Sequence, residues 1–444
     1  MAQNQAEDSL DFKKLVPVLV VVLVDVLGLT ILIPILPYYA IAFGADATII
    51  GLIGASYPMM QFMFVPILGA LSDRIGRKPV LATAQMGTFI SLLILGFSNA
   101  LWMIFLSRIL DGITGANLAT AQSVITDSTD EANRAKGLGL IGATFGVGFV
   151  IGPVLSGLAL WVSGNNYGAP AFLAAGFAFV SFLLTTFMLE ETHPPEKRGL
   201  SDESRKRNFR RMGEYMFHPT LGILFLFVFL QQVIFGSFQL TFAPFTLTKL
   251  GLNSLGNVIF FTVFGIVLAV MQGGFAGPLN KRFGEYKLVF VGLFLFASGF
   301  LLTGFTPTMP VSWYEREALI TELQQGGQAT TAEELEDQIQ LLPPEGVETG
   351  NVGLIYMLLA LLPVPIGYGL ISPSLNSLLT KRADPAKIGE VLGVAAAFTA
   401  LGSVVGPLVG GAVFDYLGPN WVYLLGGAAA YLLFILIRLR LKPT

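Results

Sequence analysis

The stretch Gly69-Ala-Leu-Ser-Asp73-Arg74-Ile-Gly76-Arg77-Lys78-Pro79 decides the fold, because it packs dense charge between two long apolar segments. Those segments, at 51–71 and 79–97, are each long enough to cross a bilayer, which takes about 20 residues. A turn this short between two spans lies in headgroup water. Its basic residues outnumber its single acid, which predicts a cytoplasmic position.

Composition excludes most soluble classes. Charged residues make up 12% of the chain, hydrophobic residues 54%, and the mean hydropathy is +0.70; soluble domains carry roughly 25% charged residues. The absence of cysteine excludes disulfides and thiolate metal sites. His193 and His218, the two histidines, lie beside prolines in a polar loop and are poor ligands or bases. We therefore predict a membrane protein that is not an enzyme, with no catalytic residue, metal, cofactor or nucleic-acid partner.

Apolar segments recur along the whole chain, and in lipid they must be helices because their backbone groups are satisfied internally. We expect twelve spans, near 15–37, 51–71, 79–97, 101–124, 138–161, 170–189, 220–245, 255–276, 287–305, 352–375, 389–413 and 420–437. If the N-terminus is cytoplasmic, 23 of the 26 basic residues lie in cytoplasmic segments. The exceptions are Lys249 and Arg316, on the outer side, and Arg108, within a span. The sequence predicts an all-α polytopic protein of an inner or plasma membrane, with both termini cytoplasmic.

Two repeats divide the chain into halves. Gly277-Pro-Leu-Asn-Lys281-Arg-Phe-Gly284 echoes the opening stretch at an offset of 208, with Lys281 in the place of Asp73. Gly402-x-x-x-Gly406-Pro407 echoes Gly148-x-x-x-Gly152-Pro153 at an offset of 254. Such repeats are typical of transporters. The predicted organisation is a tail (1–14), a six-helix bundle (15–189), a cytoplasmic loop (190–218), a pseudo-symmetric six-helix bundle (219–437) with an extracytoplasmic insertion (306–350), and a tail (438–444).

The insertion at 306–350 accounts for the difference between the two offsets, since its counterpart in the first half is only 98–100. It holds nine acidic residues and one basic residue. Ser312-x-x-Glu315 and Thr331-x-x-Glu334 predict two capping boxes and hence a helical hairpin, which Gly326-Gly327 would interrupt. Because the first half has no comparable segment at the equivalent place, we expect the insertion to be a passive addition that transport does not require. A lid or a partner surface is the alternative.

Charges inside spans mark the candidate chemistry. Asp25 lies about midway along the first expected span, and Arg108 and Asp111 lie one turn apart in the fourth. An Asp at the centre of a membrane helix costs roughly 2.5–3.5 kcal/mol, so a carboxyl kept there is a candidate proton carrier. Asp25 as a structural polar contact, and Arg108–Asp111 as a plain ion pair, are the alternatives.

These motifs resemble a known family. The opening stretch resembles the loop between helices 2 and 3 of major facilitator transporters. Asp25-Val-Leu-Gly28-x5-Pro34-x-Leu-Pro37 resembles the first-helix motif of the 12-helix drug:proton antiporters, especially the tetracycline antiporters. Arg108-Ile-Leu-Asp-Gly112-x-x-Gly115-Ala116 resembles their fourth-helix motif, which implies a role for Arg108 in proton transfer.

The resemblance also implies a gate and an antiporter motif. The gate would pair Asp73 and Arg77 with Asp127 and with the start of helix 11, and its residues are Gly69, Asp73, Arg74, Gly76, Arg77 and Asp127. The glycine motif and its echo comprise Gly148, Gly152, Pro153, Gly157, Gly402, Gly406 and Pro407. Small residues allow close helix approach, and we expect Gly148 and Gly152 to pack on the other half. Tetracycline exporters are expected to carry a His in helix 8 and an Asp in helix 9; neither occurs at 255–276 or 287–305, so the antiporter class is implied without tetracycline as the substrate.

Aromatic and amide side chains are the candidates for the substrate site, because such a lining suits amphipathic organic molecules. The candidates are Tyr57, Gln61, Gln231, Phe235, Phe238, Gln239, Tyr368 and Asn376. An aromatic stripe at helical spacing also fits plain packing or lipid contact.

The sequence predicts a monomeric, proton-coupled exporter of small organic or drug-like compounds that works by alternating access in a lipid bilayer. A proton symporter or uniporter for a sugar or metabolite is the alternative within transport. A non-transporting membrane receptor on the same fold is the alternative from another class.

Overall fold

A computed structural model describes residues 12–115, 117–128, 131–193, 196, 218, 221–327, 341–384 and 387–440. Within these residues the regular secondary structure is helical throughout. The terminal tails up to residue 11 and from 441, most of the expected loop at 190–218, and the second expected capping box at Thr331 lie outside the described residues.

Eight helices form the N-terminal half, residues 12–188, and the rest form the C-terminal half, residues 221–440. The first set is α1 (Phe12–Leu32), α2 (Leu36–Ile41), α3 (Ala47–Ile75), α4 (Arg77–Gly96), α5 (Leu101–Thr114), α6 (Asn117–Ser128), α7 (Glu131–Ser163) and α8 (Ala169–Met188). The second set is α10 (Leu221–Leu250), α11 (Ser254–Ala269), the π-helix η2 (Val270–Phe275), α12 (Ala276–Phe283), α13 (Glu285–Gly304), α14 (Arg316–Gly327), α16 (Val352–Leu361), α17 (Pro363–Arg382), α18 (Ile388–Leu417) and α19 (Pro419–Arg440).

The described part of the chain contains ten helical segments that are long and apolar enough to cross a membrane. The first of the twelve expected spans appears as a shorter apolar helix, Val18–Leu32. The expected span at 101–124 is divided between α5 and α6. The protein is therefore a multi-pass membrane protein, and the count of twelve stays a prediction.

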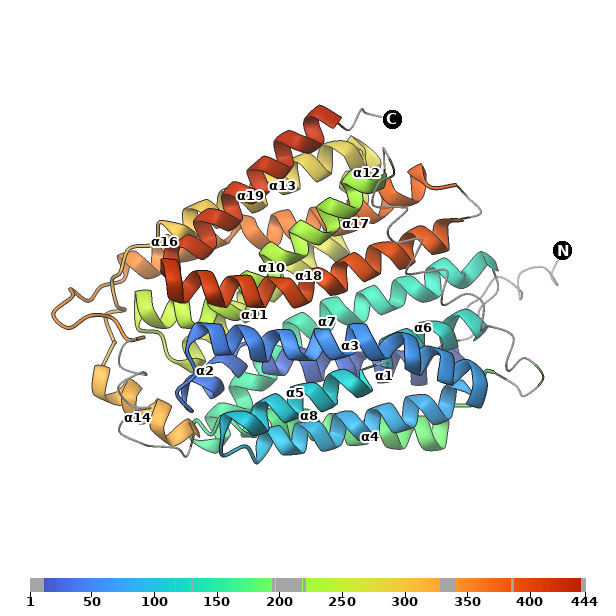
Figure 1. The fold of residues 1–444 in the computed structure, drawn as a ribbon, viewed down its shortest axis with the longest axis horizontal. Helices are drawn as coiled ribbons and strands as arrows, with labels where there is room; N and C mark the ends of the chain where they lie inside the picture. Colours follow the sequence, from blue (N-terminus) through green and yellow to red (C-terminus); the bar gives the residue numbers. More distant parts are fainter. Residues whose placement is uncertain are drawn as a thin grey trace.

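Each half packs mainly on itself, and the two halves meet along two seams (Figure 1). In the N-terminal half α1 packs on α7 and α8, and α4 on α8; in the C-terminal half α10 packs on α18, and α13 on α17 and α19. The seams are formed by α3 with α18 and by α7 with α11. Each seam thus joins one helix from each half, which suits a molecule whose halves rock against each other.

Three expected spans are interrupted, and each break has a local cause. The span 101–124 breaks at Gly115, after Gly112, where a Cβ atom would collide with the carbonyl oxygen of Tyr57. The span at 352–375 changes helix at Leu362, directly before a proline. The span at 255–276 passes into the π-helix at residues 270–275, which contains two glycines. The expected spans near 255–276 and 352–375 are nevertheless present, within Ser254–Phe283 and Val352–Arg382.

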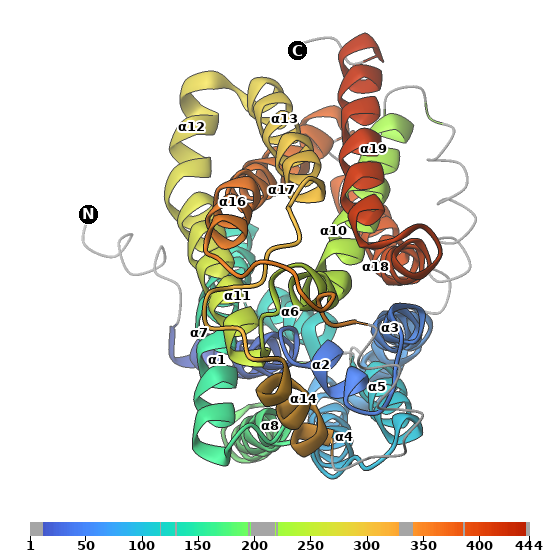
Figure 2. The same ribbon diagram turned by 90° about the vertical axis from the view of Figure 1, so that its left-hand side faces the viewer.

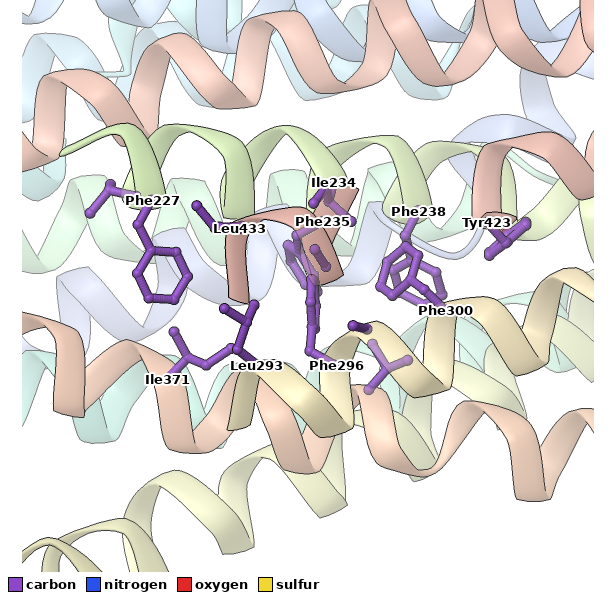
Figure 3. Packing of buried hydrophobic residues seen from close by; sticks show 14 of the residues in the cluster. Phe227, Ile234, Phe235, Phe238, Leu293, Phe296, Phe300, Ile371, Tyr423 and Leu433 are labelled. Atoms are coloured by element: carbon purple, nitrogen blue, oxygen red, sulfur yellow. The ribbon is translucent and has the colours of Figure 1, made fainter. Parts of the chain in front are cut away.

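The core of the C-terminal half is aromatic. Phe238 contacts the rings of Phe300 and Tyr423, with ring centroids 5.8 and 6.4 Å apart, and Figure 3 shows these side chains in one cluster with Phe296. Aromatic pairs of this geometry add roughly 0.5–1.5 kcal/mol beyond burial. The cluster packs α10, α13 and α19 of this half together.

Two ends of the molecule serve as reference points. The α14 end carries α2, α14 and the start of α11, and the Asp73 end carries the last turn of α3 and the end of α19; they lie at opposite sides of Figure 1. At the Asp73 end Gly76 (φ 111°) joins α3 to α4, and Gly284 (φ 81°) joins α12 to α13. Only glycine adopts such values readily, so the repeat at offset 208 corresponds to two equivalent corners.

The insertion differs from its expected form. Helix α14 is described from Arg316 to Gly327, and its end relative to the glycine pair lies outside the described residues. Ser312 does not cap this helix; its hydroxyl donates to Oδ1 of Asn351 at 3.0 Å. Leu323 and Glu322 of α14 are buried, so this part of the insertion packs against the rest of the protein. That transport does not need the insertion stays a prediction. Figure 2 looks onto this helix and shows it lying across the end of the bundle.

Candidate functional site

A cavity of about 830 Å³ lies between the halves and extends toward the Asp73 end. Its walls come from α3, α6, α10, α17 and the N-terminal part of α18, so both halves contribute. Its described polar lining is Gln61, Gln122, Gln231, Gln232, Tyr368, Ser372, Asn376, Glu390, Thr399 and Ser403. A large cleft with many amides and few charges suits an amphipathic organic molecule.

Two side chains of α10 organise the wall of this cavity. Nε2 of Gln232 donates to Oγ of Ser403 at 3.0 Å, and the hydroxyl of Tyr368 donates to Oε1 of Gln232 at 3.4 Å. The ring of Tyr368 stacks on Phe235 with centroids 4.2 Å apart. These contacts link α10, α17 and α18 and hold the polar groups in fixed positions.

The structure places four of the eight predicted substrate residues in this lining: Gln61, Gln231, Tyr368 and Asn376. Phe235 supports Tyr368 from behind, and Tyr57 accepts a hydrogen bond from Gln61 at 3.1 Å. Phe238 lies in the aromatic core, and Gln239 lines a separate gap of about 10 Å³. The spacing of residues along α10 does not show which side of the helix faces the cavity and which side faces the aromatic core. Sequence reasoning also missed Gln122, Glu390 and Ser403 as lining residues.

The predicted charges come together beside the cavity. Nη1 of Arg108 lies 3.3 Å from Oδ2 of Asp111, and Arg108 is 3% exposed. Asp25, on α1, lies close enough to Asp111 for their charges to interact, and Tyr57 lies near both. Two carboxyls and one guanidinium therefore share one partly buried cluster.

The break between α5 and α6 connects this cluster to the cavity. Asn117, in the first turn of α6, donates from Nδ2 to Oδ1 of Asp25 at 3.0 Å. On the other side of the break, Nε2 of Gln61 donates to the carbonyl oxygen of Gly115 at 3.0 Å. One interrupted helix thus holds both the carboxyl of Asp25 and a cavity amide. Asn117 was missed, although an Asn two residues after Gly115 was the available signal.

The predicted gate residues meet around Arg77. Its guanidinium lies 2.5 Å from Oδ1 of Asp73 and 3.3 Å from Oδ2 of Asp127, and it donates to Oγ of Ser72 at 2.6 Å. Glu191 accepts from the backbone N–H groups of Arg77 and Lys78, at the start of α4, where a negative charge is favourable. The predicted contact of Arg77 with Asp127 is thus observed, and the contact of Arg77 with Asp73 is an addition; pairing with the start of α18 stays a prediction.

The second half carries an equivalent pair with the charges reversed. Glu285 follows Gly284 as Arg77 follows Gly76, and Lys381 corresponds to Asp127 at the offset of 254. Nζ of Lys381 lies 2.6 Å from Oε1 of Glu285. In each half, an ion pair therefore holds the corner between two helices at the Asp73 end. The base follows the corner glycine in the first half (Arg77, with Asp127) and the acid follows it in the second (Glu285, with Lys381).

The glycine motif packs differently from the expectation. Gly148 and Gly152 face Val26 and Thr30 of α1 in the same half, and Thr30 donates to the carbonyl oxygen of Gly148 at 2.9 Å. Of the three glycines in the α7 motif, Gly157 reaches the other half, at Val258. The prediction that Gly148 and Gly152 pack on the other half is wrong, because that side of α7 is turned toward α1. Gly402 and Gly406 face α10 in the same way, beside Pro407.

At the α14 end the halves touch through backbone atoms. A Cβ atom at Gly411 would collide with the carbonyl oxygen of Ala47. Asp415, near the end of α18, accepts from the N–H and the hydroxyl of Thr48, each at 2.6 Å, at the start of α3. Tyr38 donates to the carbonyl oxygen of Leu252 at 2.8 Å. The seams are therefore closed at this end.

The apolar helices, the two packed halves and the cavity between them are the architecture of a membrane transporter. The chain belongs to the major facilitator superfamily: the profile described as "Major Facilitator Superfamily" matches residues 18–329 and 349–444. This confirms the family predicted from the motifs.

Relatives and solved structures agree with this assignment. The chain is 30% identical over 432 residues to the tetracycline resistance protein, class C, of Escherichia coli, covering 94% of each chain. It is 25% identical over 408 residues to multidrug resistance protein 2 of Bacillus subtilis, covering 91% of this chain and 90% of the relative. The crystal structure of the human organic anion transporter MFSD10 (TETRAN) shares the fold, with a TM-score of 0.65 at 23% identity over 96% of this chain and 99% of that one.

Proposed function

We propose that this transporter is a proton-coupled exporter of small amphipathic organic compounds in an inner or plasma membrane. The observation that carries the proposal is the pairing of an amide-lined cavity with the carboxyl of Asp25 through the break at Gly115. Substrate binding in the cavity and protonation of Asp25 both change contacts of the same interrupted helix, α5–α6. Substrate binding and protonation therefore affect each other. The similarity to tetracycline and multidrug resistance proteins supports this class of substrate.

The orientation follows from charge. Basic side chains gather at the Asp73 end, among them Arg74, Arg77, Lys78, Lys281, Arg282, Lys381 and Arg382, whereas the α14 end has Lys249 and Arg316. The positive-inside rule places the Asp73 end in the cytoplasm. The cavity is then accessible from the cytoplasm, which is the state in which an exporter takes up its substrate.

The energetics suffice for export. One proton that moves down 100 mV releases roughly 2.3 kcal/mol, and 1.4 kcal/mol corresponds to about tenfold. One proton per substrate therefore sustains about a fifty-fold gradient. No other energy source is required for resistance to a toxic compound.

A susceptibility screen tests the proposed function. The protein is expressed in a bacterial host that lacks its own drug exporters, and growth is measured against a panel of neutral, cationic and anionic amphipathic drugs. Protection against some of them, lost in Asp25→Asn at equal expression, supports export. Sensitisation to a compound would favour uptake, and an unchanged profile for every compound would contradict the proposal.

The cavity assignment makes a prediction for one amide. Gln231 lines the cavity and is 6% exposed, so Gln231→Leu removes a hydrogen-bonding group without opening space. We expect the affinity for a substrate found in the screen to fall by about tenfold, as for the loss of one hydrogen bond of 0.5–1.5 kcal/mol. Gln239→Leu is the control, because Gln239 lies about two helical turns further along α10 and outside this cavity. Binding measured by fluorescence that changed equally in both variants would place the substrate elsewhere.

The gate assignment makes a prediction for Asp73. Asp73→Asn removes one of the two carboxylates that neutralise Arg77. These two pairs lie within one half and are intact while the cavity is open at the Asp73 end, so the gate contact proposed for Asp73 is the one with the start of α18, formed only when that end closes. A partly exposed charged contact is worth about 0.2–1 kcal/mol, so its loss is expected to shift the equilibrium about two- to fivefold toward the state open at the Asp73 end. Thiol labelling of Asn376→Cys in the cavity measures this shift, since the chain has no native cysteine. Lys281→Gln is the matched control, and an equal response in both variants would contradict the gate role.

A further inference from the structure

The insertion is attached to the end of α10 through backbone hydrogen bonds. The N–H of Met309 donates to the carbonyl oxygen of Lys249 at 3.0 Å, and that of Val311 donates to the carbonyl oxygen of Leu250 at 2.9 Å. The last carbonyl groups of a helix have no partner within the helix. Here the insertion provides partners, so the chain leading into α14 is fixed to the C-terminal half.

The apolar side of α14 lies against the N-terminal half. Leu319 is 4% exposed and Leu323 is 0% exposed, and both pack in a cluster with Tyr38 of α2 and with Tyr167, which lies between α7 and α8. Gly326 leaves room for the ring of Tyr167, because a Cβ atom there would collide with it. Helix α14 therefore contacts the half to which it is not attached.

Glu322 is buried at the centre of this contact and joins both halves. Its Oε1 accepts from the hydroxyl of Tyr167 at 3.2 Å and from the hydroxyl of Ser254 at 2.6 Å, and its Oε2 accepts from Nδ2 of Asn253 at 3.1 Å. Asn253 and Ser254 begin α11 in the C-terminal half. A buried carboxylate is costly unless it is hydrogen-bonded; this one is bonded on both sides of the seam.

We propose that Glu322 is a positioning residue of the transport cycle and that α14 is a latch that holds the α14 end closed. Opening this end must separate α2 and Tyr167 from α11, and α14 is tied to both. The halves cannot part without breaking the bond between Tyr167 and Glu322 or detaching α14 from Asn253 and Ser254. Either event leaves buried polar groups without partners, which stabilises the closed state. The role in the cycle rests on the proposed transport function, whereas the latch itself is a conformational property.

Two single-cysteine reporters test the latch, because the chain has no native cysteine. Val258→Cys lies in the seam between α11 and α7, where Val258 is 4% exposed, and Asn376→Cys lies in the cavity. Each is labelled with a membrane-impermeant thiol reagent in vesicles of known orientation. For Glu322→Ala we expect Val258→Cys to be labelled about tenfold faster from the α14 side, equivalent to about 1.4 kcal/mol, and Asn376→Cys to be labelled more slowly from the other side.

Three further variants make the outcome unambiguous. Glu317→Ala, an exposed acid on the same helix, controls for the loss of charge and is expected to change neither labelling rate. Tyr167→Phe removes a single oxygen and is expected to shift both rates in the same direction as Glu322→Ala. Combined with Glu322→Gln, it is expected to be non-additive, because the two side chains share one hydrogen bond.

Unchanged labelling in Tyr167→Phe overturns the latch, even if Glu322→Ala fails to fold. Equal effects of Glu317→Ala and Glu322→Ala also overturn it. Neither result touches the proposed export, which the susceptibility screen decides separately.

Discussion

Substitution of Asp25 by Asn is expected to abolish proton-driven export while substrate binding persists. The carboxyl of Asp25 accepts a hydrogen bond from Asn117 at 3.0 Å, and an amide of the same shape can present its oxygen in the same place. The fold and the cavity should therefore be retained. An amide exchanges no proton, so the cycle loses its driving force. Uphill transport in energised vesicles should fall to the level of vesicles without the protein.

The control for Asp25→Asn is binding by the same variant. Substrate affinity is expected to stay within about tenfold, or 1.4 kcal/mol, of the unmodified protein. Asp25→Glu keeps a titratable group and is expected to retain part of the activity. Uphill transport by Asp25→Asn at the normal rate would remove Asp25 from the coupling mechanism.

Substitution of Gly411 by Val is expected to trap the transporter with its α14 end open. Gly411 lies directly against the backbone of Ala47 across the seam between α18 and α3, with no room for a Cβ atom. Overpacking costs typically about 1–3 kcal/mol, which shifts a two-state equilibrium by roughly 5–150-fold. Transport should fall accordingly, and Val258→Cys should become accessible from the α14 side.

Gly176→Val is the matched control for Gly411→Val. Gly176 is an exposed helical glycine of α8 with no heavy atom within 4 Å of an added Cβ, so the same change in helix propensity occurs without a collision. We expect normal transport and normal labelling. If Gly411→Val also transports normally, closure of this seam is not part of the cycle.

Local sequence patterns predicted those features that depend on few residues. The repeat at offset 208 predicted two equivalent stretches, which form the corners at Gly76 and Gly284, and the resemblance of the loop motif implied the contact of Arg77 with Asp127. Apolar length and charge predicted a helical membrane protein, and the resemblance of its motifs implied this superfamily, which the profile match confirms.

Features that depend on how helices turn toward one another were not predictable from one sequence. Gly148 faces α1 and not the other half; α7 packs on α1 of its own half and on α11 of the other, and a small-residue side fits either neighbour. Phe235 and Phe238 lie on the same stretch of α10, yet one supports the cavity wall and the other fills the core. Glu322 lies in a polar, acidic segment that predicts solvent exposure, and its burial arises only from the meeting of Tyr167 with the start of α11.

The most direct test of proton-coupled export is the movement of protons when substrate is added to sealed proteoliposomes. The protein is reconstituted with its Asp73 end accessible, a pH-sensitive dye is trapped inside, and a substrate identified by the susceptibility screen is added outside. The account predicts proton movement opposite to the substrate, absent in Asp25→Asn liposomes of equal protein content. Proton movement in the same direction as the substrate, or substrate transport with no proton movement, would contradict it.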